Sequence, residues 1–137
     1  MMDEAKINLL SDTTLYEEAL RFVQDHKMPD HSQLTGLMTF SRNWQELLDY
    51  VKHQDERDWS QQREYYKTFY HNLRRYLQDP QTGLRQRVKT DFALMTQGLS
   101  RSQEGNALDA WAQALAQEFV QHLVAEASLR AQVGRDR

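Results

Sequence analysis

The 137-residue chain contains no cysteine, two prolines and five glycines. The absence of cysteine excludes a disulfide scaffold, a cysteine-ligated metal site and a thiol nucleophile. The scarcity of proline and glycine argues against a turn-rich β-sandwich or β-barrel. No apolar run approaches the ~18 residues of a membrane-spanning helix, and the N-terminal segment lacks the basic-then-apolar order of a secretory signal. We therefore expect one cytoplasmic globular domain with no membrane partner.

Apolar residues recur with the 3.6-residue period of an amphipathic helix through most of the chain. Ser11 or Asp12 is expected to cap a first helix, which ends at Pro29. Ser32 is expected to cap a second, short helix, and Asn43 a third one. These caps open three helical segments before the break at residue 55.

The remaining helices are separated by one break, one turn and one loop. Residues 55–62 interrupt the apolar pattern before the fourth helix, and the segment Asp79–Gly83 is a stop and turn. A fifth helix is expected from Leu84 to Leu99. A loop over residues 100–106 follows, and Asn106, its last residue, is expected to cap a long final helix.

The pattern therefore predicts an all-α, single-domain bundle of five to six helices over residues 1–137. Residues 1–10 and 131–137 are expected to fray. Gly36, inside the second helix, either weakens that helix or marks a close approach of another element. The residues expected in the core are Leu47, Leu48, Val51, Phe69, Leu73, Phe92, Leu115 and Phe119.

The motifs of common catalytic and cofactor sites are absent from the sequence. It contains neither a GxGxxG nor a GxxxxGK[ST] phosphate loop, and it contains no GxSxG elbow. Metal ligands would have to come from Asp49 with His53, or from His26 with Asp30 and His31. Such pairings are expected by chance in a helical chain with 20 acidic residues and five histidines. We interpret them as solvated groups and predict no enzyme activity, no metal and no cofactor.

Charge is unevenly distributed along this chain of formal net charge −3. Residues 63–89 contain seven basic and two acidic residues, which gives this segment +5 and leaves −8 for the remainder. Three of the basic residues open the fifth helix, where cations oppose the helix dipole. Since exposed charges farther apart than ~10 Å are largely screened, this local excess, rather than the net charge, would decide whether a polyanion binds.

The fourth helix interleaves basic residues with aromatic ones. Most of the aromatic residues fall on the apolar stripe, whereas the basic residues project outward. Basic side chains contact phosphates, and aromatic or guanidinium planes stack on unpaired bases. The turn at Asp79–Gly83 would fold the basic residues of the fourth and fifth helices into one face. The candidate nucleic-acid-binding residues are Arg63, Lys67, Arg74, Arg75, Arg85, Arg87 and Lys89.

Two segments, HSQLTGLMTFSRN (31–43) and YKTFYHNLRRYL (66–77), resemble parts of the small helical subunits of type III CRISPR effector complexes. The first is similar to their leucine-rich opening helix, and the second to their aromatic-basic helix. The resemblance implies a non-catalytic subunit in antiviral defence. Several copies would assemble with other protein subunits and contact the phosphates of guide and target RNA. The acidic net charge departs from the more basic members.

Two other functions are compatible with the sequence. The first is a helical protein–protein adaptor or regulator without nucleic acid, because Tyr, Trp and Arg dominate interface hot spots. Trp59 lies off every apolar stripe, so it either covers the edge of the core or, if exposed, anchors a partner. The second is a ribonuclease, because Arg21-x4-His26 resembles the Arg-x(4–6)-His motif of the helical HEPN family. Phe22 stands where that family more often has a polar residue.

Overall fold

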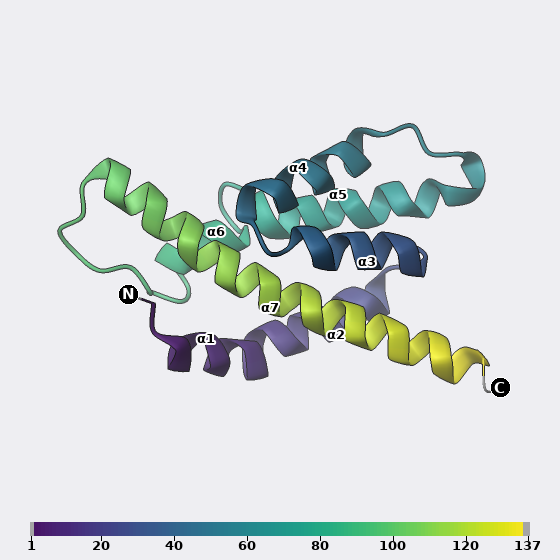
Figure 1. Ribbon diagram of the computed structural model, residues 1–137, viewed down its shortest axis with the longest axis horizontal. Coiled ribbons are helices and arrows are strands. Elements are labelled where there is room, and N and C mark those ends of the chain that lie inside the picture. Colours follow the sequence, from purple (N-terminus) through teal and green to yellow (C-terminus); the bar gives the residue numbers. More distant parts are fainter. Residues whose placement is uncertain (1, 136–137) are drawn as a thin grey trace.

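The computed structural model describes residues 2–135, and this part of the chain is helical and contains no strand (Figure 1). Helices comprise 77% of it, which confirms the predicted all-α class. A π-helical turn over Ser11–Leu15 joins α1 to α2 without a break, so the bundle has six helices, within the predicted five to six. The α-helical elements are α1 (Glu4–Leu10), α2 (Tyr16–Asp25), α3 (His31–Phe40), α4 (Trp44–Glu56), α5 (Glu64–Gln78), α6 (Leu84–Lys89) and α7 (Arg101–Arg135).

The long helix α7 runs across the whole bundle and packs against α2, α3, α4 and α6 (Figure 1). The core forms where the apolar stripes of these helices and of α5 meet. The predicted core placement is wrong for two residues, Leu48 of α4 and Phe92, which follows α6. Both side chains are only half-buried. The other six predicted core residues are 0% exposed: Leu47, Val51, Phe69, Leu73, Leu115 and Phe119.

Helices α1, α3, α4 and α7 start at side-chain caps, although not always the predicted ones. Asn43 caps α4 as predicted, because its side chain accepts the backbone N–H of Glu46 at 3.0 Å. The cap of α3 is Asp30 rather than Ser32, and it accepts the N–H of Gln33 at 3.1 Å. Ser32 instead donates its hydroxyl to the same Asp30 carboxylate. Both residue types are good caps, so only the backbone position distinguishes them.

The first helix begins earlier than predicted. Its cap is Asp3, whose carboxylate accepts the N–H groups of Ala5 and Lys6. The expected cap Ser11 lies inside the continuous helix, where it is 3% exposed and its hydroxyl is 2.8 Å from Nε2 of His122. Residues 4–10 and 131–135, in the segments expected to fray, are helical. Residues 1 and 136–137 of these segments lie outside the described part.

The fifth predicted helix ends ten residues too late. Helix α6 stops at Lys89, and Ala93 adopts the left-handed conformation with φ 49°. The N–H of Phe92 then donates to the carbonyl of Arg87, and Leu94 turns back into the core. The helix ends here because Phe92 packs over the Arg87 guanidinium instead of continuing the helix. The guanidinium carbon lies 4.6 Å from the centre of the Phe92 ring.

The last helix begins before the predicted Asn106. Ser100 accepts the N–H of Gln103 at 3.2 Å, and the Gln103 side chain accepts the N–H of Ser100 at 3.0 Å. This reciprocal pair is a capping box, so α7 starts at Arg101. The segment expected to be a loop is therefore the first turn of α7.

Two glycines are required by close approaches. A β-carbon at Gly36 would lie 2.9 Å from the Tyr50 hydroxyl oxygen, so the close approach is the correct one of the two predicted roles. At Gly83, a β-carbon would lie 2.6 Å from the carbonyl oxygen of Asp79. Glycine therefore closes the predicted Asp79–Gly83 turn between α5 and α6.

None of the helices among residues 2–135 combines the length and the apolar character needed to cross a lipid bilayer.

Candidate binding surfaces

The candidate basic residues do not form one free surface, because four of the seven are bound by carboxylates from elsewhere in the chain. The most enclosed is Arg87, whose side chain is only 13% exposed. Its two terminal nitrogens donate to the two carboxylate oxygens of Glu18 on α2, at 2.9 and 2.8 Å. Burial opposes the Arg87 charge, but these bonds and the Glu18 charge raise the pKa of Arg87 above its ordinary value. The Arg87 side chain therefore joins α6 to α2 and is not a free surface cation.

The other three ion pairs also join separate elements. Arg74 donates to the buried carboxylate of Asp55 on α4 at 3.0 Å. Arg85 donates to Asp109 on α7 at 2.7 Å, and Lys89 donates to Glu104 on α7 at 2.6 Å. The partner acids lie outside residues 63–89, in the part of the chain that carries −8. Folding therefore neutralises much of the charge excess that the sequence displays.

The remaining candidates are separated along α5. Arg75 lies near the Asp79–Pro80 turn, where it lines a shallow depression together with Arg74 and His71. Arg63 and Lys67 lie near the other end of α5, a 15-residue helix that is about 22 Å long at 1.5 Å per residue. The expected single face across the α5–α6 hairpin is thus divided. Among the described side chains, Arg63, Lys67 and Arg75 form no ion pair, and Arg63 and Lys67 lie at the opposite end of α5 from Arg75.

That end carries a group of stacked cations and rings that we call the cation–aromatic cluster. Arg57 lies 4.5 Å from the ring centre of Trp59, and Lys27 lies 4.2 Å from that of Tyr65. Arg63 lies 5.8 Å from the ring centre of a sixth member, Tyr66. The Tyr66 ring in turn contacts the other two rings edge to face, at 5.0 Å from Trp59 and 4.9 Å from Tyr65. The cluster consists of Lys27, Arg57, Trp59, Arg63, Tyr65 and Tyr66.

Local structure explains why these residues meet. Helix α4 ends at Glu56, and the chain then turns back so that the Trp59 indole N–H donates to the carbonyl of Gln54 at 2.8 Å. Trp59 is half-buried against the core, so it covers the core edge rather than standing free. The backbone N–H of Asp30 donates to the Tyr66 hydroxyl at 3.2 Å, which holds the α2–α3 connection against α5. Burial raises the pKa of Tyr66.

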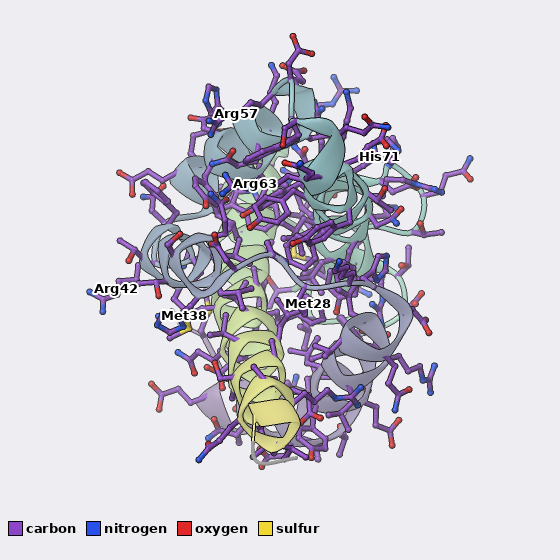
Figure 2. All side chains as sticks on the ribbon, turned by 90° about the vertical axis from the view of Figure 1, so that its right-hand side faces the viewer. Met28, Met38, Arg42, Arg57, Arg63 and His71 are labelled. Atoms are coloured by element: carbon purple, nitrogen blue, oxygen red, sulfur yellow. The ribbon has the colours of Figure 1, made fainter. Side chains whose placement is uncertain are left out.

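The cations of the cluster differ from the four paired ones in their surroundings. Among the side chains that the structure describes, none of Lys27, Arg57 and Arg63 forms an ion pair with a carboxylate. All three are exposed. Figure 2 looks onto this end of the molecule and shows Arg57 and Arg63 above the connection that carries Met28. The sequence analysis missed Lys27 and Arg57, although a cation two residues before Trp59 was a usable signal.

A groove of about 730 Å³, here the end groove, lies beside the cluster. Met28, Pro29 and Leu34 line one side of it, and Ala127 and Ala131 of α7 line the other. Ionised Asp30 and exposed His31 lie on its rim. Hydrogen bonds from the Ser32 hydroxyl and the Gln33 backbone hold the pKa of the Asp30 carboxyl below its ordinary value.

In the described part of the chain, no group of three or more potential metal ligands lies together. The Asp49 carboxylate accepts a hydrogen bond from the Gln45 side-chain amide at 2.9 Å. Both nitrogens of His26 are occupied: Nδ1 donates to the Phe22 carbonyl, so Nε2 accepts from Asn72. Arg21, 72% exposed, faces Glu17 on its own helix.

No family model, curated protein or solved structure matches this chain.

Proposed function

We propose that this chain is a non-catalytic RNA-binding subunit of a nucleoprotein complex, and that the cation–aromatic cluster contacts single-stranded RNA. The observation that carries the proposal is the stacking of Lys27, Arg57 and Arg63 on three adjoining rings, with no carboxylate partner among the described side chains. Lys89, in contrast, is exposed but forms an ion pair with Glu104. Single-stranded nucleic acids bind surfaces that combine basic side chains for the backbone with aromatic or guanidinium planes for the bases.

The two arginines and the lysines would have different roles in the complex. The guanidinium groups of Arg57 and Arg63 lie against rings on one side and are exposed on the other, so an unpaired base can stack on them. Lys27 and Lys67 supply mobile charges for phosphates. Sequence-specific contacts are not required, because base stacking tolerates any base.

Binding by the isolated chain is expected to be weak. The chain has a net charge of −3 and would offer only three or four phosphate contacts. Other protein subunits that present the RNA would compensate through a high local concentration. A role of this kind fits the resemblance to type III CRISPR small subunits, with guide or target RNA as the ligand.

The experiment is a salt titration of a fluorescent single-stranded RNA, followed by anisotropy. We compare wild type with Arg57→Glu/Arg63→Glu and with the matched control Arg42→Glu/Arg101→Glu, which makes the same change in net charge at exposed cations elsewhere. Three or four phosphate contacts predict a slope of log K against log salt of about −2 to −3 for a single strand.

The cluster variant should lose at least about tenfold in affinity and one to two units of slope, whereas the control should lose about twofold or less. An equal loss in both variants would mean that RNA responds only to overall charge, and the proposal would fail. The alternative function as a protein–protein adaptor is favoured by a different observation, the end groove.

A further inference from the structure

We infer that single-stranded RNA bound at the cation–aromatic cluster continues along α5, over a row of four side chains in which His71 is a phosphate contact. We call this set the α5 row: Arg63, Lys67, His71 and Arg75. The inference rests on the proposed function and deepens it, because it gives the bound strand a path and a length. It also joins Arg75 to the cluster through a histidine that is not among the seven candidate residues.

The row follows from the spacing of its members. Arg63 directly precedes α5, and Lys67, His71 and Arg75 follow at successive intervals of four residues. Residues four apart are neighbours on a helix surface, so each member lies about one turn from the next. All four side chains are exposed. From Arg63 to Arg75 the row is about 18 Å long, at 1.5 Å per residue.

No carboxylate engages the three permanently charged members of the row. Among the described side chains, Arg63, Lys67 and Arg75 form no ion pair. Glu64 is the one acidic residue of α5, and it is exposed and forms no ion pair with Lys67 in the described part of the chain. The row therefore offers a polyanion a series of cations that the fold does not use.

His71 connects the two ends of the row. Its side chain is 59% exposed, and its Nδ1 lies 3.4 Å from one carboxylate oxygen of Asp55 on α4. Asp55 is buried, and its other carboxylate oxygen accepts a hydrogen bond from Arg74 at 3.0 Å. Asp55 thus orients the imidazole through Nδ1. In the protonated ring both nitrogens carry a hydrogen, so Nε2 can donate to a phosphate.

The charged groups around His71 come from α4, α5 and the turn after α5: Asp55, Glu56, Lys67, Arg74, Arg75 and Asp79. Both carboxylates of α4 pair with Arg74. The Asp79 carboxylate accepts two backbone N–H groups of its own turn. A phosphate at His71 would favour the charged imidazole. RNA affinity should therefore rise as the pH falls through about 6.5, the ordinary pKa of histidine.

The first test is the length of the bound strand. The probes are fluorescein-labelled oligouridylates of about 2 to 12 nucleotides, followed by anisotropy at pH 6. A strand stacked as in a duplex carries one phosphate per about 3.4 Å, so a row of about 18 Å spans five or six nucleotides. Wild-type affinity should rise steeply up to about six nucleotides. The cluster alone has two stacked guanidinium groups and would be saturated by about three nucleotides.

The second test is the variant His71→Gln/Arg75→Gln. Its matched control is Lys52→Gln/His53→Gln, which removes one exposed cation and one exposed histidine from α4. Circular dichroism melts establish that both variants fold. At pH 6 the row variant should bind the six-nucleotide strand at least about fivefold more weakly than wild type, with a salt slope shallower by about one unit. The control should stay within about twofold.

The third test isolates His71. The single variant His71→Gln should lose the rise in affinity between pH 7.5 and pH 6, because its side chain does not titrate. The variant His71→Lys keeps a cation at both pH values, so at pH 7.5 it should bind about as tightly as wild type at pH 6. A His71→Gln variant that retains the whole rise would overturn the role of His71 as a phosphate contact.

Two further results would overturn the path along α5 and leave the proposed function standing. One is an affinity that stops rising at about three nucleotides. The other is an equal loss in the row variant and its control, while Arg57→Glu/Arg63→Glu still weakens binding. Failure of folded wild type to bind any of the strands would refute the proposed function itself and, with it, this inference.

Discussion

Arg87 and Glu18, 69 residues apart in the sequence, are joined by two hydrogen bonds between their charged groups at 2.8 and 2.9 Å. Tyr76 of α5 donates its hydroxyl to the same Glu18 carboxylate at 2.7 Å, so the pair connects α2, α5 and α6. The Arg87 side chain is 13% and the Glu18 side chain 26% exposed. An arginine that the sequence suggests for phosphate binding is therefore a structural residue.

We expect Arg87→Met to lower the free energy of unfolding by about 2–3 kcal/mol, because it leaves Glu18 and Tyr76 partly buried without their cation. The matched variant on the same helix is Arg85→Met. Arg85 and its partner Asp109 are 39% and 50% exposed, so its loss should amount to less than about 1 kcal/mol. Urea unfolding of both variants measures the difference, and equal losses would contradict the structural role of Arg87.

Gly36→Ala should destabilise the protein, although alanine is normally better than glycine in a helix by about 1 kcal/mol. The added β-carbon would lie 2.9 Å from the Tyr50 hydroxyl oxygen. That hydroxyl is held by Gln33 and Tyr70 at 3.2 and 3.3 Å, so it cannot move away freely. In a Tyr50→Phe background the same substitution should become neutral or stabilising. A thermal-melt cycle of the four proteins tests this, and an unchanged effect in both backgrounds would refute it.

Phe69→Ala should cost about 3–5 kcal/mol, the usual loss for truncating a fully buried phenylalanine. Phe69 is 0% exposed and contacts Phe22 and Tyr70 edge to face. Phe92→Ala is the comparison, because Phe92 is half-buried in the α6–α7 connection. It should cost less than half as much. A smaller loss for Phe69 than for Phe92 in urea unfolding would mean that the core is assigned wrongly.

Asp79→Asn should reduce the loss of stability in acid. The backbone N–H groups of Gln81 and Thr82 donate to the Asp79 carboxylate and hold its pKa below the ordinary value of 3.8. The unfolded chain therefore binds a proton more readily than the folded one. The Asp79 contribution is complete above about pH 4 and is lost as the pH falls through the lower folded pKa.

Asparagine keeps an oxygen acceptor for these N–H groups and does not titrate, so the variant should follow a shallower curve of unfolding free energy against pH. Urea unfolding at several values between about pH 2 and pH 7 measures both curves. Asp30 and Glu104, whose pKa values are also lowered, titrate equally in both proteins. Parallel curves for wild type and variant would contradict the prediction.

The sequence predicted the helices well where the signal is local. Asn43 and the Asp79–Gly83 turn could be identified because a cap or a turn depends on a few neighbouring residues. The Ser100–Gln103 capping box was equally local and was overlooked in favour of Asn106. The end of α6 could not be predicted from neighbouring residues. It depends on the packing of Phe92 against Arg87, which is itself bonded to Glu18 of α2.

The candidate site was predicted only in part. The sequence singled out Arg63 and Lys67, which lie in or beside the cation–aromatic cluster. It could not reveal that Lys27, from the α2–α3 connection, stacks on Tyr65. The end groove was also beyond its reach, since the groove is formed by residues 28–34 and 127–132, which are about a hundred positions apart.

The sequence by itself determined the all-α class, the helix boundaries at Asn43 and at the Asp79–Gly83 turn, and most of the residues in the core. These properties follow from the 3.6-residue period and from caps, which act between near neighbours. Only the tertiary structure decided which charges remain free. Coulomb attraction depends on distance in space and not along the chain, so Glu18 neutralises Arg87 from α2 while Arg57 and Arg63 keep their charges exposed.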